Sequence, residues 1–302
     1  MRKQELLIVM LWVLMLSYAW SIRGVFEPLA SLAVPTLLAL VLLAIAQLLL
    51  QISLLPLLLK PLGIHLPLRE WLPLGITTAT GNMIMPAQGG TIARSLYLKQ
   101  RYAVSYSYSA AIVGYQFLIR SMTYLVIALT SIIAIAALHY PWYLSEVLVG
   151  VSLVIALSLC GALLYLNIQR GQLSTRFGAL FTAWKVLLRN KVVLVCAVMI
   201  NVSVLVLNAI TFAILLRELG TVIPLAIVLA YTATKFVVLM FSILPGNIGI
   251  SEALTGGLTT LLSGQFDTGV AAALIARALM LLVGIIASGF AIVFMAKKRH
   301  GL

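Results

Sequence analysis

The chain has 302 residues, of which 63% are hydrophobic and only 9% are charged, and its mean hydropathy is +1.15. These values indicate a polytopic membrane protein and exclude a soluble domain of any size, an appended enzyme included. The formal charge of +13 comes from 20 Lys and Arg against 7 Asp and Glu, and in this class the excess is expected in loops that face anionic lipid, not on nucleic acid.

Apolar runs of about 20 residues mark segments that are long enough to cross a bilayer as helices. They predict spanning helices over residues 6–22, 34–59, 103–138, 143–168, 192–216, 222–243 and 268–296. We interpret the first run as an uncleaved helix, although its basic start is also typical of a signal peptide. The sequence therefore predicts an all-α transmembrane helical bundle that forms a single integral membrane domain over residues 1–302.

Two further segments are long enough for the membrane but contain helix-breaking residues. Residues 72–93 hold a first run that includes Asn82, Pro86, Gly89 and Gly90. Residues 243–262 hold a second run that includes Pro245, Gly246, Asn247 and Gly249. Lipid cannot hydrogen-bond free backbone groups, so irregular backbone at bilayer depth is kept only where it packs in protein or lines a wet cavity. We therefore expect these broken or re-entrant segments to form part of a transport site.

Basic residues indicate which loops face the cytoplasm. They cluster at Lys60 and Arg69, again over residues 94–101, and most densely over residues 170–191. These loops are predicted to be cytoplasmic, as is the N-terminus, and the first interrupted segment would then enter from that side. Within the third cluster, residues 177–189 have apolar positions at helical spacing and cationic flanks, which predicts a helix along the inner membrane surface.

The basic tail at residues 297–299 constrains the number of crossings. Seven crossings from a cytoplasmic N-terminus would leave this tail outside, against the usual preference of Lys and Arg for the cytoplasm. We therefore expect seven or eight crossings and favour eight, in which the second interrupted segment crosses fully and both ends are cytoplasmic.

The two interrupted segments share an order of residues: proline, glycine four residues later, then a charge. The first segment has Pro86, Gly90 and Arg94, and the second has Pro245, Gly249 and Glu252. This order predicts a duplication with repeat-like halves over about residues 34–138 and 192–296. If one segment enters from inside and its counterpart is oppositely placed, the repeat is inverted.

Ionisable residues inside predicted spans are the next signal, because a charge near the bilayer centre costs at least about 2.5–3.5 kcal/mol. The clearest cases are Arg120, Lys235 and Arg277, and the only deep acid is Glu252. In one interpretation, an ion pair between Glu252 and either Lys235 or Arg277 pins the second interrupted segment. In the other, the cations and the free N–H groups of a Gly-rich turn form a phosphate pocket. Both hold if Glu252 orients one Arg while the other cations meet the ligand.

A weaker polar stripe, Asn201, Asn208 and Thr211, falls on one face of the predicted helix 192–216. Such side chains join helices more often than they line a pathway.

Enzymatic chemistry has little support in the sequence. It contains neither Walker nor dinucleotide glycine spacing, and Asp267 is the only aspartate. Its three histidines are scattered without the carboxylate or Cys neighbours of a metal site. We therefore expect no catalytic residues, no cofactor and no metal.

The residues that are described above resemble those of the lysylphosphatidylglycerol synthase transmembrane-region family, also called flippase-like integral membrane proteins. The resemblance is most specific over residues 244–253, which look like the family's P-G-G-x-G-x-x-E signature, and it extends to Arg277. It is weaker in the first half, where Thr91 follows Gly90 and Ile119 precedes Arg120 at positions that are usually acidic in the family. The resemblance implies a flippase that, in multidomain relatives, moves an aminoacylated phospholipid made by a separate soluble domain. With its end at Leu302, this chain would be a stand-alone member.

Together these observations predict a protein of the bacterial or archaeal inner membrane that flips or scrambles a phosphate-bearing lipid or polyprenyl-linked envelope precursor. The predicted binding residues are the three cations and Glu252 together with Arg94 and the Pro, Gly and Asn residues of the two interrupted segments. The alternative is a membrane scaffold or accessory subunit of an envelope lipid- or glycan-modifying enzyme. The expected partners are a membrane lipid and either a second copy of the chain or such an enzyme.

Overall fold

The computed structural model describes residue 20 and residues 33–85, 88–137, 178–240, 249–263 and 265–299. Its regular elements within these ranges are all helices, which confirms the all-α class. They are α3 (Val34–Leu59), the 3₁₀ helix η2 (Lys60–Leu62), α4 (Leu68–Ile84), α5 (Gly89–Tyr102), α6 (Tyr106–Ala137), α9 (Gly178–Arg189), α10 (Lys191–Glu218), α11 (Leu225–Met240), α12 (Ile250–Ser263) and α13 (Phe266–Arg299).

Four of the described helical segments are long and apolar enough to cross a membrane. They are Val34–Leu62, Tyr106–Ser131, Lys191–Glu218 and Phe266–Val293, and they match four of the predicted spans. The predicted span at 222–243 corresponds to α11, whose apolar stretch Leu225–Phe236 is shorter than a span. The predicted helices at 6–22 and 143–168 lie outside the described residues apart from Trp20, so the total of seven or eight crossings stays a prediction.

Each interrupted segment contains a break between helices. In the first, α4 ends at Ile84 and α5 begins at Gly89. In the second, α11 ends at Met240 and α12 begins at Ile250. The residue beside each new helix has a positive φ, 54° at Gln88 and 84° at Gly249. This left-handed conformation favours glycine, and it re-aims the chain into the following helix. Pro86, Pro245, Gly246 and Asn247 lie outside the described residues.

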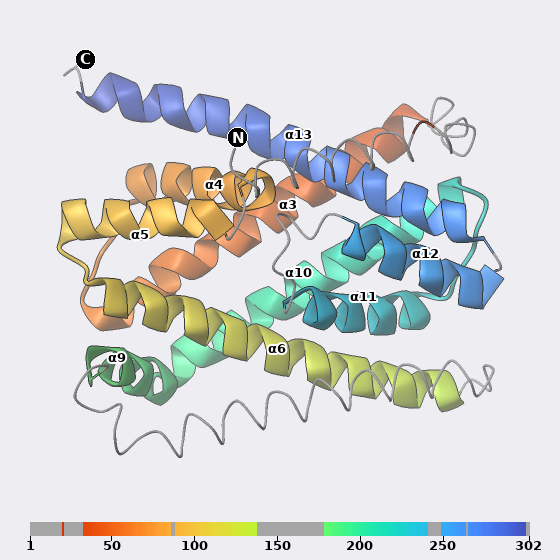
Figure 1. Cartoon of the computed structure of the whole chain (residues 1–302), viewed down its shortest axis with the longest axis horizontal. Coiled ribbons are helices and arrows are strands. Elements are labelled where there is room, and N and C mark those ends of the chain that lie inside the picture. Colours follow the sequence, from red (N-terminus) through yellow and green to blue (C-terminus); the bar gives the residue numbers. More distant parts are fainter. Residues whose placement is uncertain are drawn as a thin grey trace, which may run out of the picture.

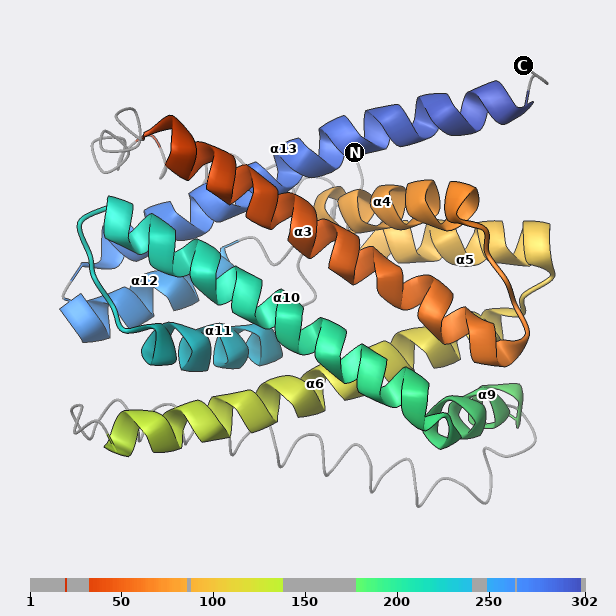
Figure 2. The ribbon, with the colours of Figure 1, turned by 180° about the vertical axis from the view of Figure 1, so that it is seen from behind.

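The described helices occur as two sets of four with similar lengths. Helices α3, α4, α5 and α6 have 26, 17, 14 and 32 residues. Helices α10, α11, α12 and α13 have 28, 16, 14 and 34 residues. In Figures 1 and 2 the long helices α3 and α10 lie side by side and run in opposite directions. Helices α6 and α13 lie along the two opposite edges of the molecule and also run in opposite directions.

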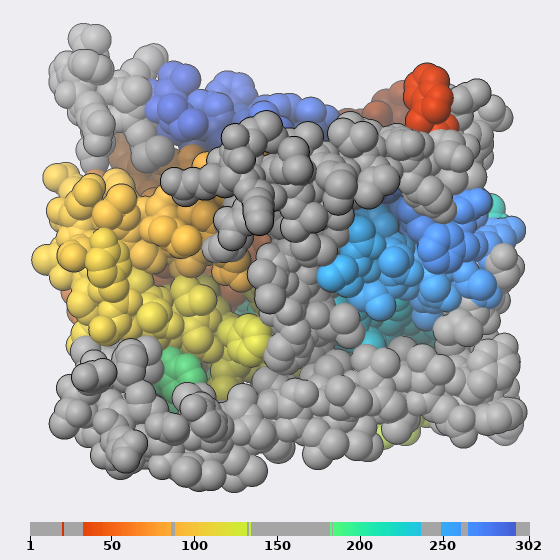
Figure 3. All heavy atoms as spheres, viewed as in Figure 1, coloured from red at the N-terminus to blue at the C-terminus, as the bar shows by residue number. Residues whose placement is uncertain are grey.

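The last helix of each set packs against helices of the other set. Helix α6 of the first set packs on α11 and α10 of the second, and α13 of the second set packs on α4 and α3 of the first. Helices α4 and α5 occupy one half of the long axis, and α11 and α12 occupy the other (Figure 1). The space-filling view shows the same separation, with α4 and α5 at the left and α12 with the start of α13 at the right (Figure 3).

One end of the molecule, called the basic end below, gathers the helix ends that carry Lys and Arg. The end of α3 with η2, the start of α4, the end of α5, α9, the start of α10 and the end of α13 all lie there (Figure 1). The basic residues on these segments include Lys60, Arg69, Lys99, Arg101, Lys185, Arg189 and Lys191, and the end of α13 adds Lys297, Lys298 and Arg299. The predicted surface helix at 177–189 corresponds to α9 and belongs to this end.

The apolar core is divided between the two ends. At the basic end, buried residues such as Leu58, Tyr115 and Leu187 join α3, α6 and α9. At the opposite end, Phe212 and Ala271 belong to a second cluster between α10 and α13. Polar and charged side chains are also buried between the helices, among them Gln47, Asn201, Lys235 and Glu252.

Candidate functional site

A cavity of about 220 Å³ borders the second core cluster. Helices α3, α10, α11 and α13 form most of its wall, and α4 and α12 contribute Met83 and Ser251. Two cations line it, Lys235 and Arg277. Five neutral polar residues also line it: Gln47, Gln51, Asn208, Thr211 and Ser251. The described lining contains no carboxylate, so its formal charge is positive.

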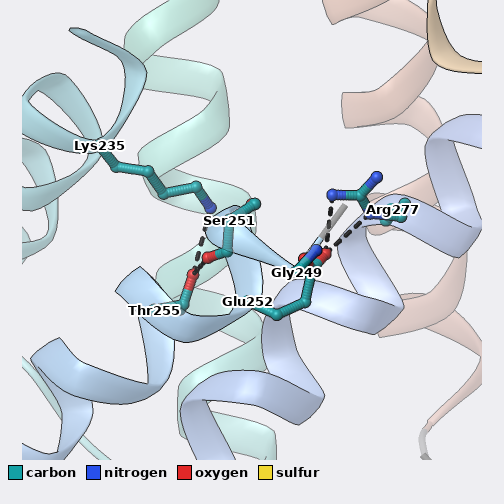
Figure 4. Close-up of polar contacts among 6 residues, drawn as sticks. All are labelled: Lys235, Gly249, Ser251, Glu252, Thr255 and Arg277. Carbon is teal, nitrogen blue, oxygen red and sulfur yellow. Dashed lines mark hydrogen bonds and ion pairs between the residues drawn. The ribbon is translucent and has the colours of Figure 1, made fainter. Parts of the chain in front are cut away.

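Glu252 and Arg277 form a buried ion pair beside this cavity (Figure 4). Oε1 of Glu252 accepts hydrogen bonds from Nε and Nη2 of Arg277, each at 2.8 Å. Oε2 of the same carboxylate accepts the backbone N–H of Gly249 at 2.8 Å. This second bond is half of a capping box, in which an acid in the first turn satisfies the N–H that precedes the helix. Glu252 therefore fixes both the start of α12 and the position of one cavity cation.

Lys235 is held differently, by neutral groups. Its ammonium donates to Oγ1 of Thr255 at 3.3 Å (Figure 4) and lies 4.1 Å from the centre of the Phe212 ring. The residue is only 6% exposed, and it makes no ion pair within the described part of the chain. Of the two candidate partners for Glu252, the structure therefore selects Arg277, and Lys235 remains as a buried cation against an aromatic face.

The polar stripe on α10 joins helices at two depths. Gln47 of α3 donates to Thr211 at 3.0 Å and accepts from the Asn208 amide at 2.8 Å. About two turns before Asn208 on α10, Oδ1 of Asn201 accepts from Nε of Arg120 on α6 at 3.3 Å. The stripe thus acts as the expected link between helices, and Asn208 and Thr211 also line the cavity.

The predicted site residues of the first half lie apart from this lining. Arg120 is bonded to Asn201 between α6 and α10 and is not among the lining residues. Arg94 is buried on α5 and does not line the cavity either. The three predicted cations therefore do not share one pocket in this structure, because only Lys235 and Arg277 face the cavity.

Asn82 and the glycines of the first segment hold α4 against α5. The Asn82 side chain accepts the backbone N–H of Thr91 and donates to its hydroxyl, each at 2.9 Å. A Cβ on Gly90 would lie 2.1 Å from the carbonyl oxygen of Thr78, and one on Gly81 would lie 3.0 Å from the Cα of Gly90. Gly89, the first residue of α5, likewise has the Met85 side chain close to its missing Cβ position. These residues position the hairpin, and its contribution to the cavity is Met83.

Sequence reasoning missed the polar residues that α3 supplies. Gln47 and Gln51 stand four residues apart in the apolar run 34–59, so they lie on one face of the helix and both reach the cavity. A pair of amides at this spacing in a span is the signal that could have found them. A buried acid, Glu70, was also missed, and it accepts hydrogen bonds from the hydroxyls of Tyr97 and Tyr102 at the basic end. Burial, and then this bond to Glu70, raises the pKa of Tyr102 above its usual range.

No group of three or more His, Cys, Asp or Glu within the described ranges is placed to hold a metal ion. The chemistry that the cavity offers is recognition by two cations, amides and hydroxyls. The fold and this cavity define a multi-pass, all-helical membrane protein with a cation-lined internal site.

The comparison with protein families gives the class a name. Residues 5–288, nearly the whole 302-residue chain, match the family described as the lysylphosphatidylglycerol synthase TM region, and the chain belongs to that family. The resemblance read from the Pro/Gly/Glu motif and Arg277 is thereby confirmed. No curated protein and no solved structure matches the chain.

Proposed function

We propose that this protein moves a phosphate-bearing lipid between the leaflets of the membrane, without catalysing a reaction. The observation that carries the proposal is the cavity that brings Lys235 and Arg277 together between spanning helices. Buried cations in a membrane protein are expensive and usually mark a substrate or ion pathway. Membership in a family that is linked to lipid modification and translocation supports the same conclusion.

The two sets of helices support an inverted repeat as the scaffold for this transport. In each set a long helix, two shorter helices and a second long helix follow in the same order, and the corresponding long helices run in opposite directions (Figures 1 and 2). Inverted repeats place the substrate site at the interface of the two halves. The cavity has such a position, since α3 and α4 of one set and α10 to α13 of the other all line it.

Within this scaffold the hairpins α4–α5 and α11–α12 are re-entrant. At about 1.5 Å per residue, a helix of 14 residues such as α5 or α12 is about 21 Å long and does not cross a hydrocarbon core of about 30 Å. The first hairpin then enters from the basic, cytoplasmic end and the second from the opposite end. In this arrangement α11 belongs to a re-entrant hairpin and is not counted as a span. The four long helices and the two predicted spans at 6–22 and 143–168 then give six crossings, in place of the seven or eight expected from the sequence. Six crossings also bring the basic tail to the cytoplasm.

Transport by such a site needs shelter only for the headgroup. Carrying a charged, hydrated group through hydrocarbon is the costly step, and Lys235, Arg277 and the neutral polar side chains offset it along the path. The acyl chains remain in the bilayer, beside the apolar faces of α3 and α13 that are exposed at Leu42 and Ile286. Direction then comes from a gradient or a downstream sink, and without either the protein is a scramblase.

A leaflet-exchange assay in vesicles tests the proposal. The purified protein is reconstituted with a panel of phospholipids that carry a fluorophore on one acyl chain, and a membrane-impermeant quencher reports the outer-leaflet fraction. We expect exchange of at least one phospholipid above that of empty vesicles, and a loss of this exchange in Lys235→Gln. The matched control is Arg217→Gln, which removes an exposed cation at the end of α10 that does not line the cavity.

Two results would contradict the proposal. One is exchange no faster than in empty vesicles for every lipid in the panel, and the other is equal exchange by the wild type and Lys235→Gln. Either result, combined with capture of an envelope-modifying enzyme by the intact protein, would favour the scaffold function instead. Elution as a single species in detergent confirms that each variant is folded.

A further inference from the structure

The charge of the cavity carries an inference about the headgroup, which rests on the proposed function. We propose that the transported lipid has a compact anionic phosphodiester headgroup whose remainder bears hydroxyls and no ammonium group. Aminoacylated and amine-bearing phospholipids are thereby excluded as preferred substrates. The juxtaposition that supports this is Lys235, which has no ion pair within the described residues, beside Arg277, whose charge is balanced by Glu252, with several neutral polar groups around one small cavity.

The first step concerns Glu252, the one carboxylate near the cavity in the described part of the chain. Both of its oxygens are occupied, Oε1 by two nitrogens of Arg277 and Oε2 by the backbone N–H of Gly249. The residue is 4% exposed and does not line the cavity. An ammonium group on a substrate would therefore find no free carboxylate there.

The second step concerns Lys235, which has hydrogen-bonding capacity to spare. An ammonium has three N–H donors, and the described contacts of Lys235 include one hydrogen bond, at 3.3 Å to Thr255. The Phe212 ring faces the charge but offers no lone pair for a short hydrogen bond. A phosphate oxygen in the cavity would accept a hydrogen bond from this ammonium, whereas a substrate ammonium would place a second positive charge beside a buried one.

The third step concerns the neutral groups, which suit hydroxyls. Within the described residues, the Gln51 amide and the Ser251 hydroxyl line the cavity and make no side-chain hydrogen bond. An amide offers both donors and acceptors, and a hydroxyl does the same, so each pairs with a polyol or a sugar.

The fourth step concerns size. The cavity volume of about 220 Å³ lies below the range of about 300–1,000 Å³ that is usual for ligand pockets. A phosphate with a glycerol or a similarly small polyol has this scale, and an oligosaccharide does not. The site therefore selects for a small headgroup as well as for negative charge.

The test compares three headgroups in the same vesicles. Acyl-labelled phosphatidylglycerol is anionic with free hydroxyls. Phosphatidylethanolamine carries one ammonium in place of the glycerol hydroxyls, and lysyl-phosphatidylglycerol adds two ammonium groups to phosphatidylglycerol and becomes cationic. We expect phosphatidylglycerol to exchange at least about tenfold faster than lysyl-phosphatidylglycerol, because like charges brought together at a desolvated site are strongly disfavoured. Phosphatidylethanolamine should also be slower than phosphatidylglycerol.

Lys235→Gln should reduce the ratio of the phosphatidylglycerol and lysyl-phosphatidylglycerol rates, while Arg217→Gln should leave it unchanged. Native mass spectrometry of each lipid bound to the wild type gives a second measurement that does not depend on transport or on the variant. Equal rates and equal retention of the three lipids, or a preference for the aminoacylated lipid, would overturn this inference and leave lipid translocation standing. No exchange of any lipid, by contrast, would contradict translocation itself.

Discussion

Glu252 is the residue on which both the start of α12 and the position of Arg277 depend. It makes three hydrogen bonds of 2.8 Å, to two nitrogens of Arg277 and to the Gly249 backbone. Removing one partner of a buried ion pair leaves the other charge uncompensated, which costs about 3–5 kcal/mol, whereas replacing both partners by apolar residues is often nearly neutral. This asymmetry makes the pair testable without a transport assay.

We therefore expect Glu252→Leu to lower the thermal unfolding temperature more than the double variant Glu252→Leu/Arg277→Met does. The measurement is thermal unfolding of the purified protein in one detergent for the wild type, both single variants and the double variant. Equal, additive losses for the two substitutions would show that the carboxylate and the guanidinium are not coupled. Arg217→Met, which removes an exposed cation from α10, controls for the loss of charge alone.

At the scale of helices, the α4–α5 hairpin depends on close contact through glycine. The Cβ of Gly90→Ala would lie 2.1 Å from the Thr78 carbonyl oxygen and 2.9 Å from the Asn82 backbone nitrogen, and backbone atoms cannot move aside as a side chain can. We expect this substitution to cost about 1–3 kcal/mol of stability, as for overpacking elsewhere. The position is also next to Thr91, so the Asn82 bonds at the break would be strained.

The matched control is Gly257→Ala on α12, where an added Cβ meets no atom within 4 Å. Alanine is preferred over glycine in a helix by about 1 kcal/mol, so this variant should be as stable as the wild type or slightly more stable. Thermal unfolding of both variants checks the pair of expectations. A Gly90→Ala protein with wild-type stability would show that α4 and α5 are not in contact at this point.

Trp184 is one of the side chains that attach α9 to α6. The Trp184 indole N–H donates to the Ala111 carbonyl at 2.8 Å, and the ring packs where Gly114 leaves room for it. Trp184→Phe keeps a ring but removes the hydrogen bond, which is worth about 0.5–1.5 kcal/mol net. We expect faster hydrogen exchange of α9 amides in this variant, with exchange in α12 unchanged. Equal exchange of α9 in the two proteins would show that Trp184 does not hold it.

The sequence predicted the long helices well, and physical reasons explain where it failed. The helix predicted at 34–59 and the observed α3 coincide because an uninterrupted apolar run leaves a chain in lipid no alternative to a helix. The pairing of Glu252 could not be chosen in advance, because Lys235 and Arg277 are equally plausible partners until α11, α12 and α13 are packed. Arg120 does not line the cavity with Lys235 and Arg277. Its guanidinium instead donates to Asn201 of the neighbouring α10, a contact that the sequence does not reveal.

For the molecule as a whole, the gathering of basic residues at one end fixes the proposed orientation. Positive residues favour the cytoplasmic side. The single variants Lys99→Cys and Lys185→Cys should therefore react with a membrane-impermeant thiol reagent only after the cells are opened. Val222 and Gln265 are exposed at the opposite end, so the single variants Val222→Cys and Gln265→Cys should react in intact cells. The background for all variants is a chain whose two native cysteines, Cys160 and Cys196, are replaced by Ala.

The accessibility of position 250, the first residue of α12, distinguishes six crossings from eight, and the variant Ile250→Cys measures it. If α11–α12 is a re-entrant hairpin with its break at mid-depth, a bulky impermeant reagent reaches a cysteine at 250 from neither face of the membrane. If α12 instead crosses fully, making eight spans, its first residue lies at the cytoplasmic face of the membrane, and position 250 reacts once the cells are opened, as position 99 does. We expect no labelling at 250 in either condition and full labelling after denaturation in detergent. Labelling from the cytoplasmic side alone would restore eight crossings and remove the symmetry between the two hairpins on which the proposed inverted repeat depends.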